Sequence, residues 1–355
     1  MYEDTNLASG LECIRLLNTI KTLGERLKFS KPFEVVLGCI TPRADTRPAD
    51  DICSLYDHRL KALMWTVVVM ALHRSDDAFI GAKSAHDLPL PQEPTPQAQA
   101  TSPRMMLLKP EGDGPFPAVV LGHQCGGLVF SKTNPKAANW SMLGWAQDFV
   151  RQGYVTLLID FMGPRDALSV CQLPQNGVTF GRTTKDFLQS AEHLRRLPYV
   201  NPNQLAMVGF SQGALIAFFA NSASIRNEFK LGPGFNAYVS FYPYCGYARN
   251  GFGNYAGNVV QEDLDKPHLV FTGGKDNETP AEDCEKLLTP LAQKGAPIQY
   301  QSYPDATHCW DCKSLNGFTK PGHRGQVTYL FNEEVTQDSR QKMYRFLQAS
   351  LGLQR

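Results

Sequence analysis

Residues 205–216 read Leu-Ala-Met-Val-Gly-Phe-Ser-Gln-Gly-Ala-Leu-Ile. The first four form an apolar run typical of a buried strand, and the small apolar residues after Ser211 predict a helix. Between them, Gly209–Gly213 matches the pattern G-x-S-x-G, in which glycines remove the Cβ atoms that would clash in a sharp turn. We therefore predict that Ser211 projects a nucleophilic hydroxyl at the carboxyl end of a strand. The backbone N–H of Gln212 opens the helix and is a free donor for negative charge.

Outward from this turn, strand and helix signals alternate from Met105 to the end of the chain. Short apolar runs predict strands at residues 105–108, 118–121, 154–159, 205–208, 237–241, 268–271 and 298–303. Besides the helix after Ser211, amphipathic spacing predicts helices at residues 140–152, 183–197, 280–294 and 335–351. This order predicts an α/β fold with a mostly parallel central sheet and helices on both faces. Together with the turn at Ser211, it predicts the α/β-hydrolase fold.

The first hundred residues differ in character from the rest. Leu7 to Leu27 has apolar residues at helical spacing. Asp87 to Pro103 is rich in Pro, Gln, Ala and Thr, the composition of a flexible linker. We therefore predict an N-terminal extension at residues 1–103, with a helical segment, a Pro-rich linker and some disorder. The catalytic domain is predicted at residues 104–355.

An acid and a base are expected after the serine, in the order Asp or Glu and then His. Asp276 and His308 each lie in a loop directly after a predicted strand. The carboxyl ends of parallel strands meet at one edge of a sheet, so both side chains are predicted to converge on Ser211. The imidazole would take the hydroxyl proton, and the carboxylate would fix its tautomer. Glu278 is the alternative acid and His323 the alternative base.

The loop Gly122–Gly127 follows another predicted strand and reads Gly-His-Gln-Cys-Gly-Gly. Its glycines let the backbone approach a substrate, so it is predicted to supply a donor of an oxyanion hole. We assign the two donors to the backbone N–H groups of Cys125 and Gln212. His123 is expected to order the loop by hydrogen bonding and is also a candidate for the substrate pocket.

The other candidate pocket residues adjoin predicted strand ends and have aromatic, sulfur-containing or cationic side chains. They are Phe161, Met162, Arg165, Phe210, Tyr242, Tyr244 and Trp310. Aromatic side chains at this edge suit an acyl or aryl ester. Arg165 has two interpretations: its guanidinium binds a substrate carboxylate, or it anchors its own loop to a carboxylate of the protein.

Five segments, in this order, resemble the dienelactone hydrolase family. They are residues 118–128 (AVVLGHQCGGL), 160–165 (DFMGPR), 209–213 (GFSQG), 274–276 (GKD) and 303–308 (YPDATH). The resemblance runs from about Met105 to the end and implies an α/β-hydrolase with a small or absent cap and no metal or other cofactor. The founding members carry a cysteine nucleophile and, in the oxyanion loop, a glutamate that restrains it. Ser211 and Gln124 stand in those places here, which points to a serine-using esterase branch.

These residues predict a carboxylic ester hydrolase that acts on small acyl, aryl or lactone esters through an acyl-enzyme on Ser211. Two alternatives stay open. One is a serine peptidase or amidase with the same triad, and the other is a non-catalytic binding protein that retains the fold.

Charge and hydropathy argue against other classes of partner. With 35 Lys+Arg and 34 Asp+Glu, the chain has no bulk charge for nucleic acid or a membrane surface. No apolar run reaches the ~20 residues that span a bilayer. The best candidate, residues 62–72, is either a buried element of a cytoplasmic protein, which we favour, or part of an export signal behind an over-extended start. Monomer and homodimer both stay open.

The nine cysteines fit neither a small disulfide scaffold nor a zinc module. Cys309 and Cys312 form a C-x-x-C without a second pair, which favours ordinary or locally paired thiols over a metal site. If the protein is exported, a structural disulfide is expected among four cysteines on predicted loops or strand ends. These are Cys125, Cys171, Cys245 and Cys284.

Overall fold

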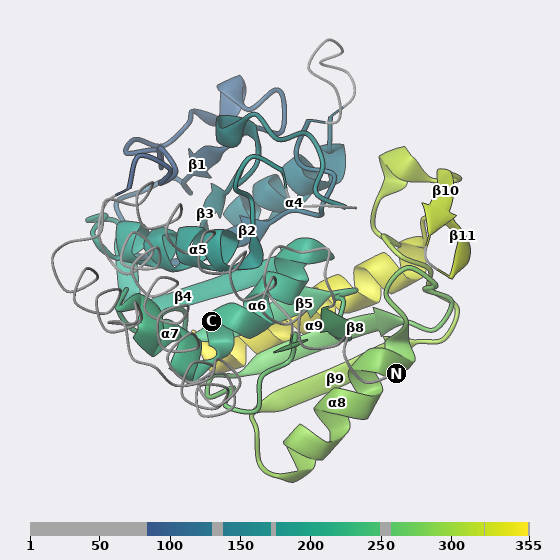
Figure 1. Ribbon diagram of the computed structural model, residues 1–355. Coiled ribbons are helices and arrows are strands. Elements are labelled where there is room, and N and C mark those ends of the chain that lie inside the picture. The colour runs from purple at the N-terminus through teal and green to yellow at the C-terminus, as the bar shows by residue number, and fades with distance from the viewer. Residues whose placement is uncertain (1–83, 130–137, 172–174, 249–256, 323, 354–355) are drawn as a thin grey trace, which may run out of the picture. The chain divides into compact units, whose positions relative to one another are not determined.

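The computed structural model describes residues 84–129, 138–171, 175–248, 257–322 and 324–353 (Figure 1). The predicted helix at residues 7–27, the apolar segment 62–72 and His323 lie outside the described residues. Within the described part, no helix combines the length and the apolar character needed to cross a membrane. All described residues belong to one compact unit, which is built around a seven-stranded sheet.

The sheet has the strand order β1-β3-β2-β4-β5-β8-β9. Its strands are β1 (Met106–Leu108), β2 (Phe116–Gly122), β3 (Val155–Leu158), β4 (Val200–Phe210), β5 (Ala237–Phe241), β8 (His268–Gly273) and β9 (Ile298–Tyr303). β1 is antiparallel to β3, and every other neighbouring pair is parallel. The predicted mostly parallel sheet is therefore confirmed, with each predicted strand present.

Helices cover both faces of the sheet (Figure 1). They are α4 (Trp140–Arg151), α5 (Phe180–Arg195), α6 (Gln212–Asn221), α7 (Ala223–Phe229), α8 (Ala281–Gln293) and α9 (Glu333–Ser350). Successive strand side chains point to opposite faces. Val120 and Met207 therefore pack in one core with α5, α6 and α8, while Val119 and Val208 pack in the other with α4 and α9. A sheet buried on both faces explains the continuous apolar runs in the sequence.

Two helices begin earlier than predicted because polar side chains cap them. The Thr179 hydroxyl accepts the N–H of Arg182 at 3.2 Å, so α5 begins at Phe180. The Asn332 side chain accepts the N–H of Val335 at 3.0 Å, so α9 begins at Glu333. Such caps satisfy N–H groups that have no partner within the helix.

Several short elements were not predicted. Besides α7, they are the antiparallel pairs β6 (Tyr247–Ala248) with β7 (Gly257–Asn258) and β10 (Thr319–Gly322) with β11 (Gly325–Thr328), and the 3₁₀ helices Gln97–Gln99, Gly163–Arg165 and Lys313–Leu315. The β10–β11 hairpin lies beside the carboxyl end of β8, because the Asn277 side chain donates to the Gln326 carbonyl at 2.7 Å. It therefore stands at the edge of the sheet where the site is expected.

Residues 84–103 pack against the rest of this unit despite their linker-like composition. Leu88 and Ala100 are buried. Asp87 pairs with Arg182 at 3.1 Å, and the Pro91 carbonyl accepts from His193 Nε2 at 2.6 Å. This stretch is thus fixed along α5 by polar contacts that composition does not predict, and the domain boundary at residue 103 stays a prediction.

Candidate active site

Ser211 occupies the turn between β4 and α6 with a φ of +53°, a left-handed conformation unusual for a non-glycine residue. A Cβ atom at Gly209 would lie 2.2 Å from the Gly213 carbonyl oxygen, and one at Gly213 would lie 2.3 Å from the Gly122 carbonyl oxygen. Only glycine fits at either position. The Ser211 N–H donates to the Phe241 carbonyl at 2.9 Å, which anchors the turn to β5.

Ser211, His308 and Asp276 lie in one chain of hydrogen bonds. The Ser211 Oγ is 3.0 Å from His308 Nε2, and His308 Nδ1 is 2.7 Å from Asp276 Oδ2. The Asp276 carboxylate also accepts from the N–H groups of Glu278 and Thr279, at 2.9 and 2.8 Å. Both of these N–H groups bind Oδ1, whereas Oδ2 accepts the Thr279 hydroxyl at 2.7 Å as well as contacting the imidazole, and together the bonds fix the orientation of the carboxylate. The structure therefore brings together the three side chains that the sequence placed after three different strands.

A second carboxylate lies near the other nitrogen of the same imidazole. Glu278 Oε2 lies 3.9 Å from His308 Nε2, and the carboxylate also binds Lys320 at 2.7 Å and the Tyr329 hydroxyl at 2.8 Å. Burial lowers the pKa of His308, but Asp276 and Glu278 together outweigh burial, so this pKa lies above its ordinary value. Glu278 is not at Nδ1, which is where an orienting acid would be, so it does not take the place of Asp276.

Of the two predicted oxyanion donors, Gln212 directly follows Ser211, and Cys125 lines the same cavity as Ser211. Gln212 is the first residue of α6, and the N–H groups at the start of a helix have no acceptor within it. Cys125 lies in the loop after β2, where a disulfide joins it to Cys171 and its carbonyl accepts the Val170 N–H at 2.9 Å. These contacts fix the loop beside the serine. The donor role of both N–H groups stays a prediction.

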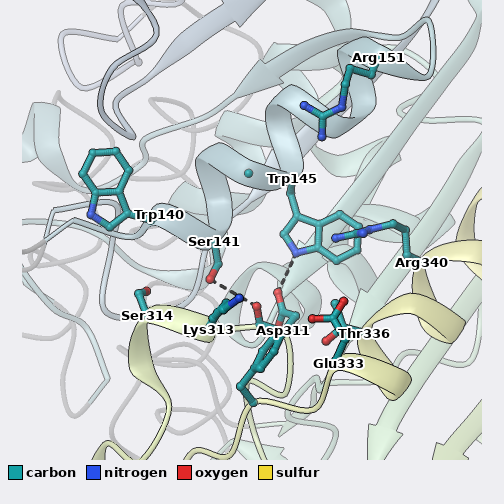
Figure 2. Close-up of a pocket in the computed structure, with 12 residues that line it drawn as sticks. Trp140, Ser141, Trp145, Arg151, Asp311, Lys313, Ser314, Glu333, Thr336 and Arg340 are labelled. Carbon is teal, nitrogen blue, oxygen red and sulfur yellow. Dashed lines mark hydrogen bonds between the residues drawn. The ribbon is translucent and has the colours of Figure 1, made fainter.

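A cavity of about 460 Å³ opens over the serine. Ser211, Cys125 and Cys309 line it, together with Lys320. Its apolar lining comes from Leu168, Leu315, Phe318 and Tyr329. A larger cavity of about 540 Å³ lies elsewhere and does not contain Ser211 (Figure 2). We take the smaller one as the candidate site because it contains the Ser211 hydroxyl.

The structure does not bring the aromatic and sulfur-containing pocket candidates to the wall of this cavity. Phe161, Met162, Phe210, Tyr242 and Trp310 are at most 1% exposed and do not line the cavity. Each belongs to the packed layers around the strand ends, since both faces of the sheet are covered.

Three further candidates are also absent from the lining of this cavity. His123 is fully buried and stacks on the Phe161 ring at 3.8 Å, with its Nδ1 2.7 Å from the Gln124 carbonyl, so it orders the loop. Tyr244 is half-buried and packs against the apolar core. Arg165 forms two 2.7 Å bonds with Asp186, so its second interpretation, as an anchor within the protein, is the one the structure shows.

The residues that do form the cavity walls come largely from segments without a regular sequence pattern. Leu168 follows the 3₁₀ helix Gly163–Arg165, Leu315 ends another, and Phe318, Lys320 and Tyr329 belong to the β10–β11 hairpin or flank it. No periodic signal identifies such residues, because their spacing follows neither a strand nor a helix.

Six cysteines form three disulfides in the described part of the chain. The pairs are Cys125–Cys171, Cys245–Cys284 and Cys309–Cys312. Potential metal-ligand atoms of Cys309, Asp311 and Cys312 lie within 4.8 Å of one another. The two sulfurs are bonded to each other, so they are not available as thiolate ligands in this state.

A model of the dienelactone hydrolase family matches residues 104–351 of the chain. Among solved structures, a dienelactone hydrolase-like protein of Klebsiella pneumoniae subsp. pneumoniae MGH 78578 is 17% identical with a TM-score of 0.51, covering 67% of this chain and 90% of that one. The apo form of Thermogutta terrifontis esterase 2 is 16% identical with a TM-score of 0.51, covering 71% and 90%. At such identities these structures show the fold alone. No curated protein matches the chain.

Proposed function

The chain belongs to the dienelactone hydrolase family, and from this premise we propose that it is a serine-dependent carboxylic ester hydrolase. The observation that carries the proposal is the 3.0 Å contact between Ser211 Oγ and His308 Nε2 at the wall of an open cavity. A serine hydroxyl is a weak nucleophile until a base takes its proton. The contact supports His308 as that base, because its Nε2 lies within hydrogen-bonding distance of the hydroxyl.

The first half of the reaction acylates the serine. Ser211 Oγ attacks the ester carbonyl carbon while His308 Nε2 takes its proton. Asp276 holds the opposite ring nitrogen and stabilises the imidazolium that forms. Negative charge develops on the carbonyl oxygen and is met by the N–H groups of Gln212 and Cys125. The imidazolium then protonates the leaving alcohol, which departs and leaves an acyl-enzyme.

The second half uses the same groups for water. His308 takes a proton from water, the hydroxide attacks the acyl carbon, and the Ser211 oxygen leaves with the proton returned by the imidazolium. The raised pKa of His308 suits this second role, because a more basic imidazole accepts the water proton more readily.

The position next to Cys125 supports serine rather than thiolate chemistry. Gln124 carries a neutral amide, whose Oε1 accepts from Asn139 at 2.6 Å and whose Nε2 donates to the Tyr242 hydroxyl at 3.3 Å. An amide held in this way brings no negative charge to the nucleophile. Ser211 needs no such charge to restrain it, because its hydroxyl is neutral at rest.

The cavity supports small neutral esters as the substrate class. Its volume of about 460 Å³ falls within the range of small-molecule sites. Lys320 is the one charged residue in its described lining, and Glu278 neutralises it at 2.7 Å. Leu168 and Phe318 are exposed large hydrophobic residues at its wall, 38% and 46% accessible. Acyl, aryl and lactone esters of modest size match this combination.

The test combines a covalent probe with a substrate panel. We expect a fluorophosphonate to label the chain at Ser211 and the Ser211→Ala variant to be unlabelled and inactive. Nitrophenyl esters of increasing acyl length, aryl esters and lactones should be hydrolysed, whereas peptide anilides should not. Esterase 2 of Thermogutta terrifontis is itself phosphonylated by cyclosarin, which makes this reagent class a suitable probe for the fold. Full esterase activity in Ser211→Ala would refute the proposal.

The remaining outcomes separate the alternatives. Labelling of Ser211 with cleavage of anilides but not esters would assign a peptidase or amidase. Absence of both labelling and hydrolysis would assign a binding protein that retains the fold.

A further inference from the structure

The wall of the Ser211 cavity contains a disulfide that the proposed mechanism does not use. Cys309 directly follows His308 and is bonded to Cys312. Cys309 lines the cavity, and the two residues are 2% and 1% exposed. What reaches Cys309 from solvent through this cavity must therefore be small.

We propose that Cys309–Cys312 is an exchange site for small-molecule thiols that enter the cavity, and that opening this disulfide lowers hydrolysis. The second part rests on the esterase function proposed above. A thiolate attacks Cys309 Sγ, which forms a mixed disulfide and releases Cys312 as a thiolate. A second thiolate then attacks the small-molecule sulfur, releasing Cys309 as a thiolate and a small disulfide. The two small-molecule thiols together lose two electrons, and the protein disulfide gains these two electrons.

The disulfide lies between the loop of the predicted oxyanion donor and the base. Gln124, the neighbour of Cys125 in that loop, places its Nε2 3.7 and 3.6 Å from the two sulfurs. The Tyr242 hydroxyl lies 3.8 Å from Cys309 Sγ, and its ring packs edge-on to His308 at 4.7 Å between centroids. A change at the sulfurs therefore reaches both parts of the site through direct contacts.

Reduction forces such a change because bonded and non-bonded sulfurs need different spacing. Disulfide sulfurs are about 2.0 Å apart, whereas non-bonded heavy atoms rest at roughly 3.5–4.0 Å. In a packed wall, that separation displaces neighbours. Cys309 also has a φ of +57°, a left-handed conformation that costs energy for a residue with a Cβ atom. The disulfide closes a ring that contains residues 309–312. Opening this ring lets the backbone next to His308 relax.

The far side of the ring is fixed, which directs the movement toward the site. The Asp311 carboxylate accepts from the Trp145 indole at 2.7 Å. Figure 2 shows the Trp145 bond, and Trp145 and Asp311 both line the larger cavity. Because Asp311 is held on that side, the Cys309 side takes up the displacement.

The other two disulfides close longer loops than Cys309–Cys312, although Cys125 and Cys171 also line the cavity. They join residues 46 and 39 positions apart, whereas Cys309 and Cys312 are 3 apart. A disulfide restricts the unfolded chain more when it closes a longer loop. The Cys309–Cys312 bond therefore contributes least to folding by this effect, while it lies nearest to the base.

The experiment titrates the full chain with dithiothreitol, a dithiol. Hydrolysis of a nitrophenyl ester is followed, samples are quenched with iodoacetamide, and alkylated cysteines are mapped by mass spectrometry. We expect at least a tenfold loss of hydrolysis over the concentration range in which the peptide with residues 309–312 gains two carbamidomethyl groups. Oxidised glutathione, added to reduced protein that has not been quenched, should restore activity, and Cys309 and Cys312 should then no longer be alkylated by iodoacetamide.

Two double variants make the assignment specific. Cys309→Ser/Cys312→Ser should have the low activity of the reduced protein and no response to dithiothreitol, with circular dichroism to show that it folds. Cys245→Ser/Cys284→Ser also lacks one disulfide, but neither cysteine lines the cavity, so it should keep the full response. Opening of Cys309–Cys312 in the wild-type chain without loss of hydrolysis would overturn the proposal. Prior opening of either other disulfide would do the same.

Tryptophan emission separates this proposal from the proposed function. Trp310 is one of the four residues of the ring, so its emission should change when the ring opens. Dithiothreitol should cause no such change in the Cys309→Ser/Cys312→Ser variant. If the oxidised chain neither hydrolyses esters nor is labelled at Ser211, the esterase function fails. Emission and alkylation then still decide whether exchange occurs at this site.

Discussion

Replacing Gly213 by alanine should destabilise the protein at the point where the turn at Ser211 meets the end of β2. The new Cβ would lie 2.3 Å from the Gly122 carbonyl oxygen and 2.5 Å from its carbon, both backbone atoms of β2. Ordinary contact begins at 3.4 Å, so the two backbones would have to separate by roughly 1 Å in a close-packed interior. No side-chain rotation can relieve this clash.

The magnitude follows from two opposing effects. Alanine in place of glycine favours a helix by about 1 kcal/mol, whereas overpacking a core costs about 1–3 kcal/mol and more when backbone must move. We expect the free energy of unfolding of Gly213→Ala to fall by about 2 kcal/mol net. Because Gly122 begins the loop of Cys125, a shift of this size should also lower kcat/KM by about 10²-fold.

Gly144 provides the matched control. It also lies within a helix, α4, but it is exposed, and a Cβ there would meet nothing within 4 Å. Gly144→Ala should therefore stabilise the protein by about 0.5–1 kcal/mol without changing hydrolysis. Urea unfolding followed by tryptophan emission, with kcat/KM on a nitrophenyl ester, measures both variants. A Gly213→Ala protein as stable as Gly144→Ala would refute the contact argument.

Other changes have distinct signatures. Asp276→Asn should keep the fold and lower kcat by about 10⁴-fold, since an amide favours the wrong imidazole tautomer; stopped-flow assays with intact circular dichroism would show this. Glu278→Gln removes a charge that raises the pKa of the His308 imidazole, so the acid limb of the kcat/KM profile should move to lower pH. Lys320→Met removes a charge that lowers this pKa, so the same limb should move to higher pH. A shift of the limb in the same direction for both variants would contradict the electrostatic account. Arg165→Met should cost about 3–5 kcal/mol in urea unfolding because it leaves the buried Asp186 carboxylate unpaired; adding Asp186→Leu should restore much of it.

The central sheet could be predicted from sequence because its burial is nearly uniform. Strands such as β2 and β5 are covered on both faces, so their apolar runs are continuous and leave little ambiguity. Helix starts were less accurate, since a cap such as Thr179 precedes Phe-Gly-Arg, which does not look helical in isolation. The β10–β11 hairpin was missed because each strand has four residues and Pro321 argues against a strand.

The candidate site likewise has a part that could be predicted from the sequence and a part that could not. In a parallel sheet, loops after neighbouring strands emerge at one edge, so the positions of Asp276 and His308 relative to Ser211 follow from topology alone. The cavity wall follows no such rule. Phe210 adjoins the nucleophile in sequence, yet it points into the core against Trp145, whereas Phe318 lies 107 positions after Ser211 and lines the cavity. Topology therefore predicts where the three candidate triad residues meet, while the shape of the cavity wall depends on the packing of irregular segments. The effect of that wall on substrate preference has to be measured through variants such as Phe318→Ala.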